Sequence, residues 1–271
     1  MSDNQQFDQN GASDSNGIIL ETKDVSKSFG GLVAVDNVSV KINEGEITGL
    51  IGPNGAGKST LFNLLSGFLN VSQGQVLLNG QDVTDMRSDE RAQKGLIRTF
   101  QITRELSGMT VIENMMLGAK NNPGEDVLAT LVKRDEVSQF EQEKRKRAQE
   151  LLKYLELWDL RDEYAGNLSG GQRKLLELGR SLMADPEVLL LDEPMAGVNP
   201  DLTDHILDRI MTLREKKGMS FLIVEHDIQA IMNISDTVIG MHQGKILVSD
   251  EPEVVQEDEE LLKAYLGGGQ V

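Results

Sequence analysis

The sequence predicts an α/β fold built around a mainly parallel sheet, and three observations support this. Short apolar segments alternate with longer helical ones between residues 188 and 241, which is the pattern of parallel strands joined by helices. Val188–Leu191 is an uninterrupted run of Val and Leu, as expected for a strand that is buried on both faces. A glycine-rich loop, residues 52–57, follows one predicted strand and leads into a helix.

The N-terminal half is predicted to begin with a polar tail and to continue mainly as strands. Residues 1–17 are rich in Asp, Asn, Gln, Ser and Gly, so we expect a disordered tail and no signal peptide. Partial alternation and short apolar runs mark the strands, and Asn79-Gly80 is a strong turn signal after the last of them. The predicted elements are strands over 18–26, 38–42, 46–51 and 75–78 and a helix over 58–66.

The rest of the chain is predicted to be richer in helix. Within residues 136–158, the basic run Lys144–Arg147 is flanked by Glu at helical spacing, which favours a solvated helix face over a contact patch. Residues 250–271 are predicted to form an acidic helical tail with a glycine-rich end. The predicted elements are helices over 110–118, 136–158, 170–183, 200–216 and 227–233 and strands over 188–191, 220–224 and 237–241.

Composition excludes several classes of function. The 271 residues include 44 Asp and Glu against 27 Lys and Arg, and the net charge of −17 argues against binding to free nucleic acid or to an anionic membrane surface. The absence of cysteine removes disulfides and thiolate zinc sites, and it fits a reducing cytoplasm. No apolar run approaches the roughly 20 residues that cross a bilayer, so at a membrane another subunit would have to span it.

The glycine-rich loop has the sequence of a phosphate-binding loop. Gly52-Pro53-Asn54-Gly55-Ala56-Gly57-Lys58-Ser59 matches G-x-x-x-x-G-K-[ST] in the required position between a strand and a helix. Its backbone N–H groups and the helix N-terminus would bind phosphate oxygens, and Lys58 would reach the β- and γ-phosphates of ATP. Ser59 would bind Mg²⁺ through its hydroxyl, and Thr60 would donate to a phosphate. An ordinary glycine-rich turn that caps a helix is the weaker alternative.

Two acidic residues follow the buried strand Val188–Leu191. Parallel sheets place their ligand chemistry at the carboxyl ends of strands. There Asp192 would hold Mg²⁺ through a water, and Glu193 would polarise an attacking water as a general base. A pair of turn carboxylates is the alternative, and the neighbouring phosphate loop makes it the weaker one.

Four further motifs occur in order along the chain. Phe29 precedes the phosphate loop, Gln101 follows it, Leu168-Ser169-Gly170-Gly171-Gln172 precedes Asp192, and His226 comes last. In this order and spacing the chain resembles the ABC-type ATPases: the Leu168–Gln172 segment matches the signature, Gln101 the Q-loop glutamine, His226 the switch histidine and Phe29 the aromatic residue that stacks on adenine. Each residue alone has an ordinary structural explanation, and only their joint order carries the resemblance.

The resemblance implies an architecture and a set of roles. It covers residues 18–267 and implies a P-loop NTPase domain with a RecA-like core, an antiparallel β subdomain and a helical signature subdomain over about 102–185. Two subunits would pair head to tail, so that Ser169, Gly170, Gly171 and Gln172 of each bind the nucleotide of the other. The resemblance gives catalytic roles to Lys58, Gln101, Glu193 and His226, and Gln101 would also contact the Mg²⁺.

One position departs from the family pattern. Many relatives have an aspartate six residues after the catalytic glutamate, in the segment called the D-loop, whereas this chain has Asn199. A neutral amide can form a hydrogen bond across the dimer, but it cannot form an ion pair there.

Three short strings indicate a subfamily. Residues 98–101, 111–115 and 195–200 resemble the ATPase subunits of branched-chain amino acid importers, and pieces of them occur in urea and lipopolysaccharide-export ATPases. The resemblance implies a homo- or heterodimer on the inner face of the cell membrane, docked to permease subunits through residues about 102–165 and served indirectly by a substrate-binding protein. A soluble ABC ATPase is the alternative, though those usually carry two nucleotide domains. A non-hydrolysing regulator is opposed by the presence of Lys58, Glu193 and His226.

Overall fold

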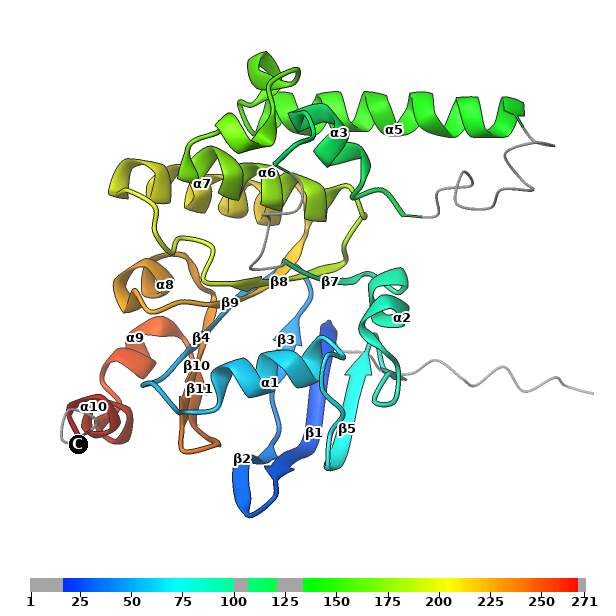
Figure 1. Cartoon of the computed structure of the whole chain (residues 1–271). Helices are drawn as coiled ribbons and strands as arrows, with labels where there is room; N and C mark the ends of the chain where they lie inside the picture. The colour runs from blue at the N-terminus through cyan, green and yellow to red at the C-terminus, as the bar shows by residue number, and fades with distance from the viewer. Residues whose placement is uncertain (1–16, 100–106, 121–133, 268–271) are drawn as a thin grey trace, which may run out of the picture.

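A six-stranded sheet forms the centre of the molecule. The computed structural model describes residues 17–99, 107–120 and 134–267 (Figure 1). The strand order is β11-β10-β4-β9-β8-β7, and every pair is parallel except β10 with β11. The strands are β4 (Ile47–Ile51), β7 (Leu96–Arg98), β8 (Val188–Asp192), β9 (Ser220–Val224), β10 (Thr237–His242) and β11 (Lys245–Asp250).

Both faces of the central strands β4, β8, β9 and β10 are buried, as the apolar runs predict. Along β9, Phe221 and Ile223 enter one hydrophobic core, whereas Leu222 and Val224 enter the other. Helices contribute to the first core, and Figure 1 shows α3, α5, α6 and α7 gathered above the sheet. The helices are α3 (Val111–Met116), α5 (Arg134–Tyr154), α6 (Gly170–Leu182), α7 (Pro200–Lys217) and α8 (Ile228–Ile234).

An antiparallel sheet shares the second core with the helix α1 (Lys58–Leu65). Its order is β2-β1-β5-β6, and β3 also pairs with β1. Asn79 and Gly80, both with positive φ, join β5 to β6, so the predicted turn is confirmed. The strands are β1 (Ile18–Phe29), β2 (Leu32–Val38), β3 (Lys41–Asn43), β5 (Gln73–Leu78) and β6 (Gln81–Asp82).

The predicted strand over residues 38–42 is wrong. Val38 ends β2 and Lys41 begins β3, and the two strands pair with different parts of β1, β2 with residues 25–29 and β3 with residues 18–21. The hydroxyl of Thr22 donates to the Val38 carbonyl at 3.0 Å and accepts from the Val40 N–H at 2.9 Å. The Thr22 hydroxyl therefore takes hydrogen bonds that a backbone group would form if residues 38–42 were one continuous strand.

Two helix boundaries also differ from the sequence prediction. The helix predicted over 136–158 ends at Tyr154, because Glu156 has a φ of 59°, which is incompatible with an α-helix. The tail predicted over 250–271 begins as strand, since Asp250 closes β11 opposite Val238. Two short helices, α9 (Pro252–Gln256) and α10 (Glu259–Gly267), follow it. Residues 1–16 and 268–271 lie outside the described part of the chain.

The described ranges also contain three short elements, namely α2 (Ser88–Gln93) and the 3-10 helices η3 (Trp158–Leu160) and η4 (Ala165–Asn167). None of the helices in the described ranges is long and apolar enough to cross a bilayer.

We expect Arg91→Met to lower the free energy of unfolding by about 3 kcal/mol, because it leaves buried carbonyls without donors. Arg91 lies in α2 and is fully buried. Its guanidinium donates to four backbone carbonyls, those of Leu64, Leu65, Thr84 and Met86. Burial lowers the pKa of Arg91 to about 10, so the side chain remains charged at neutral pH.

Urea denaturation of the wild type and of Arg91→Met measures this difference in the free energy of unfolding. Arg87→Met serves as the control, because the Arg87 side chain is 75% exposed and forms only surface ion pairs. We expect that variant to lie within about 0.5 kcal/mol of the wild type. Equal stability of Arg91→Met and Arg87→Met would contradict the structural role of Arg91.

Candidate nucleotide site

The loop between β4 and α1 requires glycine at two positions. Gly52 has a φ of 154°, and a Cβ there would lie 2.1 Å from the Met241 carbonyl oxygen. Gly57 has a φ of 104°, and a Cβ there would lie 2.5 Å from the Ala34 carbonyl oxygen. The sequence thus forms a tight strand–loop–helix turn, and the helix N-terminus gives it positive potential.

Lys58 folds back onto its own loop. Its ammonium group donates to the Gly52 carbonyl at 2.6 Å and to the Pro53 carbonyl at 3.2 Å. Only 7% of the residue is exposed, and this burial lowers the pKa of Lys58, whereas the negative charge of Glu193 raises it. The two residues that follow, Ser59 and Thr60, lie in the first turn of α1, where Ser59 is exposed.

Asp192 ends β8 and is held by an arginine from the neighbouring strand. The Arg98 guanidinium donates to Asp192 Oδ2 at 2.8 Å and to Asn63 Oδ1 at 2.5 Å. Because Asn63 lies on α1, this arginine links the phosphate-loop helix, β7 and β8. In the sequence Arg98 stands out only as part of a subfamily string, since no local pattern shows which carboxylate an arginine will contact.

The donors near the loop suit Mg²⁺. A serine hydroxyl, on Ser59, and a carboxylate, on Asp192, are hard oxygen ligands of the kind that this ion prefers. Across residues 17–99, 107–120 and 134–267, no group of three or more His, Cys, Asp or Glu side chains could hold a metal ion. This donor set fits an ion that is bound partly by the protein and partly by phosphates, not one held in a protein cage.

Glu193 and His226 meet at the carboxyl edge of the sheet. Glu193 has a φ of 49°, and its N–H donates to the Val224 carbonyl at 2.9 Å. His226 Nε2 lies 2.7 Å from Glu193 Oε1. Positive φ is uncommon for a residue with a side chain and is often found at functional sites. The structure thus brings together two predicted residues that are 33 positions apart in sequence.

The signature segment begins α6. The Ser169 hydroxyl accepts from the Gln172 N–H at 3.2 Å, while Gln172 Oε1 accepts from the Ser169 N–H at 2.9 Å, which forms a capping box. A Cβ on Gly171 would overlap the Leu202 side chain, so a larger residue there would have to displace Leu202. A Cβ on Gly170 would lie 3.9 Å from the Gly197 carbonyl oxygen, so this turn faces the segment that leads into α7.

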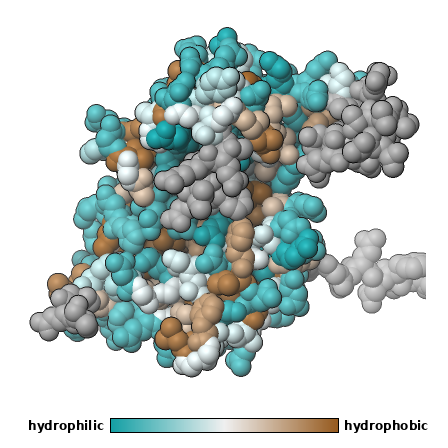
Figure 2. Space-filling view, in the orientation of Figure 1, coloured by the Kyte–Doolittle hydropathy of each residue, from teal (hydrophilic) through white to brown (hydrophobic). Residues whose placement is uncertain are grey.

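Two other predicted residues lie apart from this edge of the sheet, and a third is not described. Phe29, at the end of β1, is 47% exposed. Figure 1 places the turn between β1 and β2 at the lower end of the molecule, and Figure 2 shows hydrophobic surface at that end. Asn199 caps α7 by accepting from the Leu202 N–H at 3.0 Å. Gln101 lies outside the described residues.

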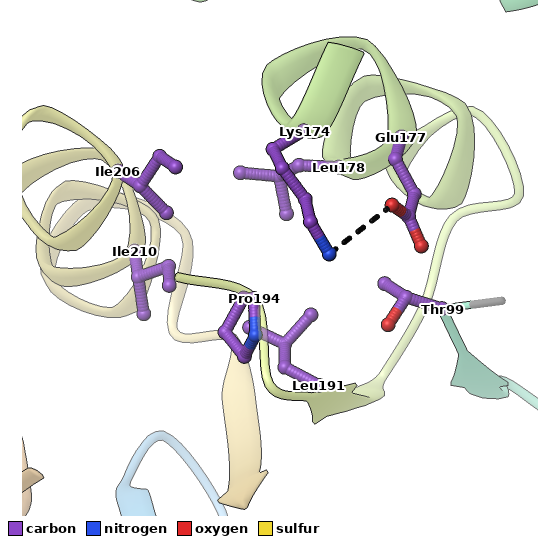
Figure 3. A pocket seen from close by; sticks show the side chains of 8 residues that line it. All are labelled: Thr99, Lys174, Glu177, Leu178, Leu191, Pro194, Ile206 and Ile210. Carbon is purple, nitrogen blue, oxygen red and sulfur yellow. Dashed lines mark ion pairs between the residues drawn. The ribbon is translucent and has the colours of Figure 1, made fainter. Parts of the chain in front are cut away.

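A small cavity lies beside Glu193, between α6, α7 and the end of β8 (Figure 3). Lys174 and Glu177 of α6 form an ion pair there at 3.9 Å, and Lys174 also donates to the Glu193 carbonyl at 3.4 Å. Its volume of about 20 Å³ holds one water, so it is not a nucleotide site. It marks the place where the signature helix contacts the Glu193 segment.

Together, the phosphate loop and the acidic end of β8 define a P-loop nucleotide-binding protein. A family model described as ABC transporter matches residues 35–196. The chain therefore belongs to the ABC transporter family and is an ATPase cassette of that family.

Its curated relatives include branched-chain amino acid transport proteins. The chain is 40% identical to the probable branched-chain amino acid transport ATP-binding protein LivG of Methanocaldococcus jannaschii, over 92% of this chain and 97% of that protein. It is 37% identical to the high-affinity branched-chain amino acid transport ATP-binding protein BraF of Pseudomonas aeruginosa, over 92% and 98%.

Solved structures of ATP-binding cassettes share the fold. The ADP conformation of the cassette MJ1267 matches with a TM-score of 0.81 and 39% identity, covering 92% of this chain and 99% of that one. A dimeric structure of the cassette MJ0796, in a post-hydrolysis state with ADP and Pi, matches with a TM-score of 0.70 and 25% identity, covering 86% and 99%.

Proposed function

We propose that this chain is the ATP-hydrolysing subunit of a branched-chain amino acid importer. The contact between His226 and Glu193, 2.7 Å at the carboxyl edge of the parallel sheet, is the observation that supports hydrolysis most directly. The names of the LivG and BraF relatives favour branched-chain amino acids over urea or lipopolysaccharide.

The roles of the site residues follow from their positions. Lys58 would leave the Gly52 and Pro53 carbonyls and bind the phosphates, together with the backbone N–H groups of residues 54–60. Phe29 would stack on the adenine ring. Ser59 and Asp192 would hold Mg²⁺, which when bound neutralises charge on the phosphates. Gln101 would complete the site from the Q-loop.

Glu193 would then take a proton from the attacking water as the general base. His226, already in contact with the Glu193 carboxylate, would fix its orientation. Because Glu193 has a positive φ, its backbone departs from the extended conformation of β8. Its side chain therefore takes another direction than it would have in a continued strand. Two neighbouring residues, Asp192 and Glu193, can therefore serve the metal and the water separately.

Pairing of two subunits would complete the site. The signature residues Ser169, Gly170, Gly171 and Gln172 form the N-terminus of α6, and this helix end would bind a phosphate held by the partner. Asn199 would form a hydrogen bond across this dimer. Residues about 102–165 of the helical subdomain would dock on the permease.

Purification from native membranes tests this function. We expect the affinity-tagged chain to bring down integral membrane subunits, and leucine to stimulate ATP hydrolysis when this complex and its binding protein are reconstituted in vesicles. The same complex carrying Lys58→Ala should not respond to leucine. Recovery with ribosomes or DNA, or a response to urea and not to leucine, would reject the proposed function.

A further inference from the structure

A buried carboxylate joins the two segments that carry Glu193 and His226. Glu225 directly follows β9 and is only 5% exposed. Its Oε1 accepts from the Met195 N–H at 2.7 Å, and its Oε2 accepts from the His226 N–H at 3.2 Å. Burial raises the pKa of Glu225, and the two N–H donors partly oppose this rise. Both oxygens are thus used by backbone groups.

The Glu225 carboxylate lies just beyond the end of the β8–β9 ladder. The β8–β9 ladder ends where Asp192 pairs with Val224, and the Glu193 N–H still reaches the Val224 carbonyl. Beyond that point, Glu225 connects the Met195 N–H to the start of the switch segment. The side chain therefore continues the cross-link between the strands after the regular ladder has ended.

The positive φ of Glu193 makes such a cross-link necessary. A residue held in the left-handed region costs on the order of 1–3 kcal/mol and persists only where its surroundings fix it. Met195 follows Glu193 by two residues, so a bond to its N–H limits the conformations of this turn. His226 follows Glu225 directly, so the same carboxylate limits the position of the imidazole.

We propose that Glu225 is a positioning residue for ATP hydrolysis, which holds the Glu193 and His226 segments at the spacing of their 2.7 Å contact. This inference rests on the proposed function. Glu225 does not touch the nucleotide in this scheme, and it acts through the two loops.

The isosteric variant Glu225→Gln tests this role. An amide offers one acceptor oxygen instead of two, and its NH₂ group would face one of the two N–H donors. We expect kcat for ATP hydrolysis to fall roughly tenfold while the Kd for ATP stays at the wild-type value. Glu90→Gln is the matched control, because the Glu90 carboxylate also accepts a backbone N–H, from Arg87 at 2.8 Å, but lies in α2.

A double-mutant cycle separates positioning from general stability. In a His226→Ala background, adding Glu225→Gln should cause little further loss of kcat, because the contact that Glu225 maintains is already gone. A merely structural role would instead give the same fold-loss in both backgrounds and would overturn the inference. If Glu225→Gln does not fold, Glu225→Asp, which keeps the charge but shortens the reach, is used in the same cycle.

The outcomes also distinguish this inference from the proposed function. A wild-type kcat in Glu225→Gln, with hydrolysis lost in Glu193→Gln, would reject the positioning role alone. Wild-type hydrolysis in Glu193→Gln would reject the catalytic assignment on which both depend.

Discussion

Replacing Glu193 by glutamine is expected to lower the rate of ATP hydrolysis by at least about 10²-fold, the loss typical of removing a general base. The amide has nearly the same volume and can keep the 2.7 Å contact with His226 Nε2. What it loses is the ability to accept a proton from water. We therefore expect ATP binding to remain, since Glu193 is not among the groups proposed to bind the phosphates.

Phosphate release measures the rate, and isothermal titration with ATP measures binding. Glu259→Gln is the control for removing one carboxylate charge, because the Glu259 side chain is 83% exposed on α10. It should hydrolyse ATP at the wild-type rate. Unchanged turnover in Glu193→Gln would remove this residue from the catalytic role, and loss of ATP binding would show that it acts on the nucleotide instead.

The sequence predicted those parts of the site whose residues are close together in the sequence. The strand–loop–helix around Lys58 and the cap of α6 at Ser169 depend on local spacing, so the motifs contain the necessary information. The contact of Glu193 with His226 depends on β8 and β9 being neighbours in the sheet. Neither motif indicates the order of the strands. Family resemblance alone indicated that these two residues belong together.

Other features had no local signal. Arg98 and Glu225 contact groups 94 and 30 positions away, and each would pass as an ordinary charged residue near a strand end. The same limit explains the wrong strand over 38–42, where the side chain of Thr22 ends one pairing and starts another. Short strands such as β7 are also hard to predict, because three residues carry little periodicity.

Replacing Lys58 by alanine is expected to weaken ATP binding roughly 10- to 100-fold, which corresponds to losing one charge-assisted hydrogen bond of about 1.5–3 kcal/mol. In the structure the ammonium group stabilises its own loop by donating to the Gly52 and Pro53 carbonyls. Binding a phosphate exchanges these neutral acceptors for a charged one, so the lysine contributes more to the complex than to the free protein. The substitution should therefore affect nucleotide binding more than it affects the fold.

Thermal unfolding at increasing ATP concentration measures both effects at once. A ligand that binds only the folded state stabilises it by RT ln(1 + [ATP]/Kd), so the wild-type midpoint should rise with ATP concentration. The Lys58→Ala midpoint should rise only at correspondingly higher concentrations. Lys94→Ala is the control, since Lys94 is exposed and donates to Gln81 on the protein surface. Equal ATP responses in Lys58→Ala and wild type would mean that the phosphates are held by the loop backbone alone, because the glycine geometry at positions 52 and 57 does not depend on the lysine.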